Sequence, residues 1–303
     1  MPKDLLDRIH EKGIRLMDEA DFPVIYTELM HNLGAVDSEC RETCLDLLWE
    51  MIDSGELQHA LLLDTGQQLV DNLKQGLGEQ GTDSVFLRTF SALLIGAILV
   101  HDEMRRRQVK VGLEPFLTPE IFRTWYQACS HYLVTEADLR GYIPGKGWAH
   151  AISHGADLLR DFAYHSYAAA AEHAEMLAIL NENLSRNDQE VFLNNDDNRL
   201  TRVVMTLLIR NELTIEQYQQ WLDDLLARFN SPPARERMAK REQVTAAFNI
   251  LTFLRALYFV LRFGMRTLAD AGFYQQTPPL RDELMALVLS TLQRMDQGMN
   301  YRT

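Results

Sequence analysis

Hydrophobic residues recur at three- and four-residue spacings along nearly the whole chain, and strict alternation of hydrophobic and polar residues is not found. Helix start signals accompany this pattern: Thr118-Pro119-Glu120 places a cap residue before proline, and Thr214 to Gln217 fits a capping box. Paired prolines at Pro232-Pro233 and Pro278-Pro279 interrupt the pattern near the C-terminal end. The pattern therefore predicts an all-α protein.

A weak internal repeat suggests how these helices are arranged. Asp37, Asp83 and Asp197 are each followed at plus ten and plus eleven by a Leu-Leu pair. Spacings of this kind are typical of stacked helical hairpins, so we expect a HEAT- or armadillo-like curved solenoid or an irregular helical array. We predict a single all-helical domain over residues 1–303. Its expected parts are repeat-like pairs at about 37–110, 118–185 and 196–263, and a C-terminal helix at about 279–297.

Composition narrows the possible partners. The chain has 303 residues, of which 47% are hydrophobic and 24% charged, as in soluble globular proteins. Its net charge of −13 argues against a nucleic-acid partner, which requires a basic surface. No uncharged apolar run reaches the ~20 residues that span a bilayer, and the N-terminus lacks a secretion signal. We therefore expect a cytoplasmic protein without a membrane partner.

The segment 139–174 carries the most informative polar pattern. If a helix begins near Trp148, a rotation of ~100° per residue places three histidines and two aspartates in one stripe. The loop before it holds three glycines and a proline, and displays basic and aromatic side chains at the helix N-terminus, where anions are favoured. The predicted stripe consists of His150, His154, Asp157, Asp161 and His165. The predicted rim consists of Arg140, Tyr142, Lys146 and Trp148.

Three interpretations of the stripe remain open at this point. His150 and His154 are four residues apart, as in helical zinc motifs, and with Asp157 they could hold a divalent metal that activates water. A histidine beside an aspartate could instead transfer protons, although no nucleophile motif surrounds Ser153. The third interpretation is that the side chains bond to one another and to neighbouring helices, lining a groove or a polar seam.

We therefore expect a binding or scaffold protein with a polar groove for a peptide, a protein or a small polar ligand. The alternative is a metal-assisted hydrolase that uses His150, His154 and Asp157. The sequence identifies neither the ligand nor the oligomeric state. It favours a protein without enzymatic activity.

Three polar residues lie inside apolar helical segments: Arg88, Asn249 and Arg255. Because buried charges need partners, we predict that these residues are buried and hold helices together. Asp102 and Glu103 are candidate partners for the arginines.

Three segments resemble the bacterial family DUF2785, a domain of unknown function. They are TDSVFLRTFSALL at 82–94, DLRGYIPGKGWAHAISHGADLL at 138–159 and NILTFLRALYFVL at 249–261. The middle segment is the longest and most specific. The resemblance implies an all-helical, cytoplasmic protein and brings no catalytic residues with it.

Overall fold

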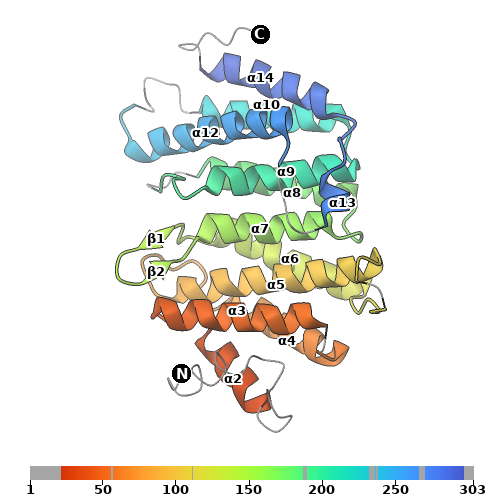
Figure 1. Cartoon of the computed structure of the whole chain (residues 1–303). Coiled ribbons are helices and arrows are strands. Elements are labelled where there is room, and N and C mark those ends of the chain that lie inside the picture. The colour runs from red at the N-terminus through yellow and green to blue at the C-terminus, as the bar shows by residue number, and fades with distance from the viewer. Residues whose placement is uncertain are drawn as a thin grey trace. The chain divides into compact units, whose positions relative to one another are not determined.

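The computed structural model describes residues 22–55, 57–110, 112–186, 190–231, 236, 238–265 and 270–296. Pro232-Pro233 and the end of the predicted C-terminal helix lie outside these residues. The described chain is built of helices with one short hairpin of strands, so the all-α prediction is confirmed (Figure 1). The chain forms two compact units, Met1–Leu158 and Leu159–Thr303, and passes from one to the other inside helix α7 (Ala151–Tyr164).

The first unit is organised around one long helix, α5. Its helices are α2 (Phe22–Asn32), α3 (Ser38–Ser54), α4 (His59–Asn72), α5 (Ser84–Arg106) and α6 (Pro119–Thr135). Helix α5 packs against α3 and α4, α4 packs against α6, and α2 packs against α3. Strands β1 (Tyr142–Ile143) and β2 (Gly147–Trp148) form an antiparallel hairpin before α7.

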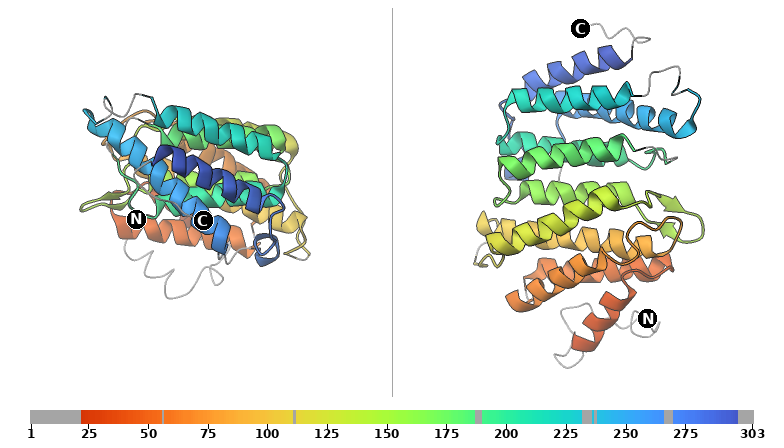
Figure 2. Two further views of the ribbon diagram at one scale, coloured as in Figure 1. Left: turned by 90° about the horizontal axis from the view of Figure 1, so that it is seen from above. Right: turned by 180° about the vertical axis from the view of Figure 1, so that it is seen from behind.

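The second unit is a set of packed helices. They are α8 (Ala170–Leu184), α9 (Asp196–Arg210), α10 (Ile215–Phe229), α12 (Arg241–Phe263), α13 (Ala271–Tyr274) and α14 (Arg281–Met295). Helix α12 packs against α9 on one side and α14 on the other, while α10 contacts α8, α12 and α14 (Figures 1 and 2). Helix α14 falls within the predicted C-terminal helix.

The predicted helix starts at Thr118 and Thr214 are both present. The Thr118 side chain accepts a hydrogen bond from the Ile121 amide, and Thr214 forms a reciprocal capping box with Gln217. The predicted stretch 37–110 contains α3 to α5, 118–185 contains α6 to α8, and 196–263 contains α9, α10 and α12. A curved solenoid stays a prediction.

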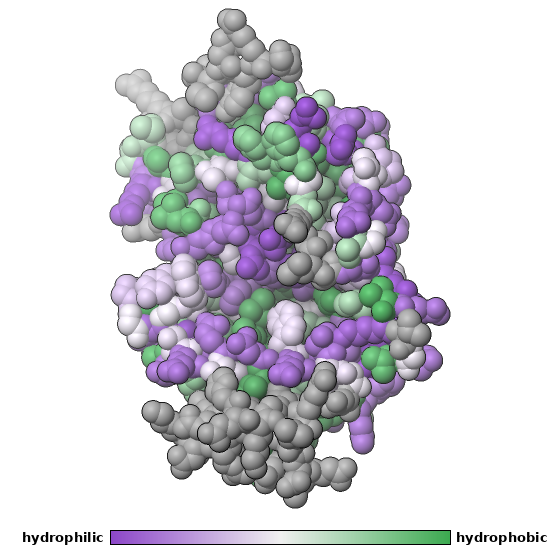
Figure 3. Space-filling model, in the orientation of Figure 1, coloured by the Kyte–Doolittle hydropathy of each residue, from purple (hydrophilic) through white to green (hydrophobic). Residues whose placement is uncertain are grey.

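Two helices, α5 and α12, are long and apolar enough to cross a membrane by length and composition alone. The most apolar window of α5 is 78% buried inside the protein, as in the core helix of a soluble protein, whereas that of α12 is 44% buried. Two such helices are weak evidence for a membrane span. On the face shown in Figure 3, hydrophobic residues are interspersed with polar ones. The cytoplasmic location stays a prediction.

Arg88 joins three parts of the first unit. Its guanidinium is fully buried and makes two bonds to the Glu136 carboxylate, with Nε–Oε2 at 2.5 Å and Nη2–Oε1 at 2.9 Å. It also donates to the carbonyl oxygens of Gln75 and Gly76, each at 2.9 Å. The expected partners Asp102 and Glu103 instead pair with Arg106 and Arg107, each four residues later in the sequence.

The other two polar residues of the apolar segments, Asn249 and Arg255, differ in burial. Asn249 is buried, accepts a hydrogen bond from the Phe192 amide at 3.0 Å and donates one to the Glu190 carbonyl. The prediction that Arg255 is buried is wrong: its side chain is 41% exposed and pairs with Asp296 at 2.6 Å. Its position within an apolar segment did not reveal that this side of α12 reaches solvent.

Candidate functional site

Helix α7 begins later than the sequence suggested. Gly147 and Trp148 belong to strand β2, and His150 has a positive φ of 50°, which no helical residue adopts. The amides of Ala149 and His150 both donate to the Gly141 carbonyl, which turns the chain before α7. The prediction of a helix beginning near Trp148 is therefore wrong, because the hairpin's own hydrogen bonds take up the residues before Ala151.

This start changes the predicted stripe. Only His154, Asp157 and Asp161 lie on α7, while His150 precedes it and His165 follows its last residue. The three helical members and His165 are all buried. Their proposed role in binding a ligand stays a prediction.

In the first unit, the stripe's histidines pack among aromatic rings. The His150 ring is stacked on Trp148 with the ring centroids 4.2 Å apart and the planes 1° from parallel. The His154 ring lies 5.2 Å from that of His150 and meets Phe90 edge-on at 5.4 Å. These contacts are those of a packed aromatic cluster.

In the second unit, the stripe's remaining members have local contacts. Asp161 pairs with Arg160 at 2.7 Å, and the His165 Nδ1 accepts a hydrogen bond from the Tyr167 amide at 3.2 Å. Within the described part of the chain, no group of three or more His, Cys, Asp or Glu residues is placed to hold a metal ion. The metal set of His150, His154 and Asp157 therefore finds no support in this geometry.

The two cations of the predicted rim hold the hairpin in place. Arg140 binds both carboxylate oxygens of Asp138, at 2.7 and 2.6 Å, and donates to the Thr82 carbonyl at 2.7 Å. Lys146 reaches both carboxylate oxygens of Asp83, at 2.6 and 2.8 Å. Because each charge already faces a carboxylate, neither is left to attract an anion.

Arg41, which the sequence analysis did not single out, binds the main chain of the hairpin. Arg41 on α3 is fully buried, donates to the carbonyls of Lys146 and Trp148, and lies over the Phe86 ring at 3.9 Å. Gly147 allows this contact: its φ is +82°, and a Cβ would lie 2.8 Å from the Cβ of Ser38. Since Arg41 is more than one hundred positions away in sequence, no local pattern could have revealed it.

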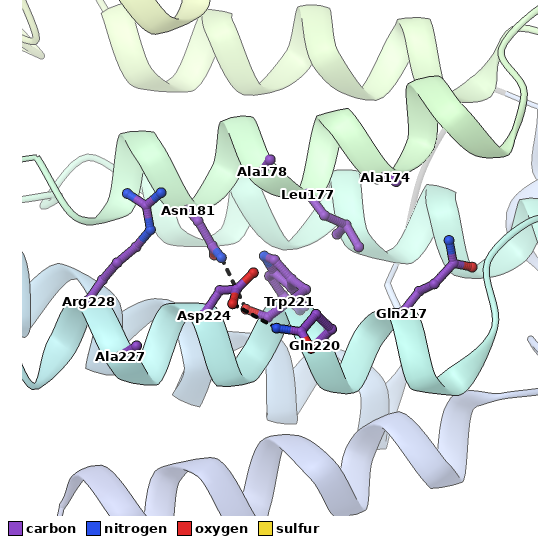
Figure 4. Close-up of a pocket in the computed structure, with 10 residues that line it drawn as sticks. All are labelled: Ala174, Leu177, Ala178, Asn181, Gln217, Gln220, Trp221, Asp224, Ala227 and Arg228. Carbon is purple, nitrogen blue, oxygen red and sulfur yellow. Dashed lines mark hydrogen bonds between the residues drawn. The ribbon is translucent and has the colours of Figure 1, made fainter.

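The structure shows a groove of about 580 Å³ in the second unit, between α8 and α10 (Figure 4). This volume lies within the usual range for ligand pockets. Small side chains leave the space open along α8, and the floor is formed by buried residues from both helices. The residues that line it are Ala174, Leu177, Ala178, Asn181, Gln217, Gln220, Trp221, Asp224, Ala227 and Arg228.

Two polar atoms at the floor of the groove lack partners among the described residues. Trp221 is only 4% exposed, and its indole Nε1–H donates to none of them. Asn181, 3% exposed, donates through Nδ2 to the Trp221 carbonyl at 3.0 Å, which leaves its Oδ1 without a donor. Both atoms are themselves buried beneath the surface of the groove, where an unsatisfied polar group costs about 1–3 kcal/mol.

Of the two charged residues that line the groove, Arg228 has an ion-pair partner and Asp224 has none within the described part of the chain. Arg228 donates to the Glu182 carboxylate at 2.5 Å and to the Ser185 hydroxyl at 3.1 Å, and the first bond lowers the pKa of Glu182. The exposed Asp224 accepts a hydrogen bond from Gln220 at 2.9 Å and has no ion-pair partner among the described residues. The Asp224 carboxylate is therefore the charged group of the groove that can pair with a ligand.

The alanine spacing on α8 is the sequence signal that could have indicated this groove. Ala174 and Ala178 lie one turn apart, and Asn181 follows on the same face. The pairing with Trp221, forty positions later, depends on the packing of α8 against α10 and is not visible in the sequence.

Fold and site together define an all-helical protein with an open groove between two helices of its second unit. The chain belongs to the family described as "Protein of unknown function (DUF2785)", whose model matches residues 73–259. The matched range includes the hairpin and both helices of the groove. None of the curated proteins or solved structures matches the chain.

Proposed function

We propose that the protein is a non-catalytic binding protein and that the groove between α8 and α10 holds its ligand. The observation that supports this proposal is the groove itself, about 580 Å³ in volume, with small side chains along α8 and the exposed carboxylate of Asp224 on α10. Amide side chains of both helices line it, so a small polar or peptide-like ligand fits its chemistry.

The chemistry of the groove favours binding over a reaction. Its lining consists of alanines, a leucine, amides, an indole, one carboxylate and one paired arginine, and contains no Ser, Cys, His or Lys. Nucleophilic catalysis needs an activated nucleophile beside a base, and this lining supplies one carboxylate, Asp224, with no second group of that kind beside it. A peptide, a protein segment or a small polar molecule is the class of ligand that fits, and we place the protein among cytoplasmic binding or scaffold proteins.

The indole N–H of Trp221 gives a direct test, because tryptophan indole protons give separate NMR signals. Protein labelled with ¹⁵N would be titrated with N-acetyl amino acid amides of varied side chain. The Trp221 signal is assigned by its loss in Trp221→Phe. Trp49 and Trp125, which lie in the first unit, serve as internal controls.

We expect some of these amides to shift the Trp221 signal while the Trp49 and Trp125 signals stay in place. If no amide moves the Trp221 signal at the highest soluble concentration, the proposed function is wrong. The same holds if all tryptophan signals move equally, since that result indicates non-specific association.

A further inference from the structure

We infer that one face of α12 is a dimer interface, at which two copies of this chain pack antiparallel through the same residues. None of these residues lines the groove between α8 and α10, so the inference is independent of the proposed ligand. The outer face of α12 consists of Val244, Phe248, Leu251, Thr252, Arg255, Ala256, Phe259 and Phe263.

Helix α12 is buried in the second unit along one side only. That side includes Ile250, Leu254, Leu257 and Leu261, and the helix packs against α9 and α14. At ~100° per residue, the members of the outer face lie on the opposite side of the helix. In Figure 1 no helix lies in front of α12. The outer face is therefore largely left to solvent.

Three phenylalanine rings make this face more apolar than an ordinary protein surface. Phe248, Phe259 and Phe263 are 45%, 62% and 75% exposed, and the rings of the last two lie 5.9 Å apart. Since an aromatic side chain has ~150–250 Å² of surface, these rings leave roughly 350 Å² in contact with water. An exposed apolar patch of this size often marks an interaction site.

The spacing of the outer face points to a second copy of the chain as its partner. Val244 precedes Phe248 by four residues, and Phe263 follows Phe259 by four. From each of the inner phenylalanines, the next members toward the helix centre lie three and four residues away. The face therefore has the same spacing read from either end of the helix.

This symmetry is what a two-fold dimer requires, because residue i then contacts j of the partner and j contacts i. An antiparallel copy of α12 places Phe248 against the partner's Phe259, and Val244 against the partner's Phe263. Each chain contributes both halves of each contact, so the hydrophobic side chains of the two copies meet along the whole face.

The charge of the outer face permits contact between two acidic chains. A net charge of −13 opposes association of two copies through most of their surface. None of the outer-face residues, all of which belong to the described part of the chain, is acidic. Their one charged member, Arg255, pairs with Asp296 at 2.6 Å. Two copies can therefore meet here without bringing carboxylates of this face together.

The size of the contact predicts a weak dimer. The rings of two copies would together bury ~700 Å², whereas stable protein–protein interfaces bury about 1,200–2,000 Å². The other residues of the outer face add to this area, so we expect a total near the lower limit and a Kd of roughly 1–100 µM.

The experiment measures the mass of the full chain by sedimentation equilibrium at concentrations across the micromolar range. The test variants are Phe248→Lys and Phe259→Glu, measured separately and as an equimolar mixture. In the mixed dimer the new ammonium group faces the new carboxylate, and the second contact keeps both phenylalanines. The matched control is Val24→Lys on α2, because Val24 is 63% exposed and belongs to the first unit.

We expect the mass of the parent protein to approach twice the 34.9 kDa of one chain as its concentration rises. Each test variant alone should weaken the dimer by about tenfold or more, and the control should dimerise like the parent. The mixture should recover most of the lost affinity. A single chain that combines Phe248→Lys with Phe259→Glu should also dimerise, because both of its contacts then pair opposite charges.

A parent protein with the mass of one chain at every concentration would overturn the inference. If such a monomer co-sedimented with phosphatidylcholine vesicles, the outer face would be assigned to a lipid surface instead. A mixture no more dimeric than its separate components would refute the antiparallel pairing and the inference with it. Near-ultraviolet circular dichroism shows that each variant is folded.

Discussion

Replacing Glu136 by Gln should destabilise the protein strongly, because it leaves the guanidinium of Arg88 without a counter-charge. Arg88 is fully buried and the Glu136 carboxylate is nearly so, with two bonds joining them. Glutamine keeps the size of the side chain and one hydrogen-bond acceptor. The substitution therefore tests the charge of the pair and leaves packing nearly unchanged.

The expected magnitude follows from the burial of the pair. Removing one partner of a buried ion pair costs about 3–5 kcal/mol, because the other charge stays in a medium of low dielectric constant. Arg88 keeps its bonds to the Gln75 and Gly76 carbonyls, so we expect a loss near the lower limit, ~3 kcal/mol. Replacing both partners, as in Arg88→Met with Glu136→Leu, should cost less than the sum of the two single changes.

The assay is urea unfolding followed by far-ultraviolet circular dichroism. The parent and Glu136→Gln are measured together with Arg88→Met, Glu136→Leu and the variant that combines the last two. The control is Lys74→Met, which removes the Lys74–Asp71 pair, whose side chains are 65% and 54% exposed. We expect this control to stay within about 0.5 kcal/mol of the parent. An unfolding midpoint of Glu136→Gln equal to that of the parent would refute the reasoning, and would assign the stabilisation to the carbonyl contacts of Arg88 alone.

Two further predictions concern core packing and pH. Gly66→Ala should lower the free energy of unfolding by about 1–3 kcal/mol, because the new Cβ would lie 1.9 Å from Cη2 of Trp125. Gly272→Ala, whose Cβ would lie 3.5 Å from its nearest neighbour, is the control, and equal urea midpoints for the two would show that the Trp125 ring moves aside at little cost. Burial, reinforced by Arg105 beside His101 and by Arg210 near His173, lowers the pKa of each histidine from 6.5 to about 4. Since the unfolded chain binds more protons between these values, stability should fall as the pH drops from 6.5 to 4, by up to ~3 kcal/mol per histidine. Urea midpoints measured across this range should depend less on pH in His173→Gln than in the parent, and parallel curves would contradict the prediction.

The helical architecture was predictable because helix formation depends on near neighbours in sequence. The capping residues Thr118 and Thr214 mark helix starts that the structure contains, and the apolar spacing marks the helices themselves. The start of α7 was missed because the segment 141–148 forms a hairpin whose two-residue strands are too short to show alternation. The sequence pattern therefore placed His150 on the helix with His154, whereas α7 begins at Ala151.

The candidate groove could not be predicted, because a groove is a relation between helices. Helical periodicity shows which side chains share a face, but not what that face contacts. Asn181 and Trp221 come together only because α8 packs against α10. Arg41 reaches the hairpin only because α3 lies next to it in the folded protein.

The order of amino acids alone determined that this chain forms helices, where several of them begin, and that its surface carries excess negative charge, since these properties depend on local hydrogen bonding and on composition. Tertiary packing alone decided that the histidines and aspartates around α7 are largely buried and that a groove opens between α8 and α10. The physical reason is that burial depends on neighbours far away in sequence, whereas helix formation depends on neighbours within a few residues.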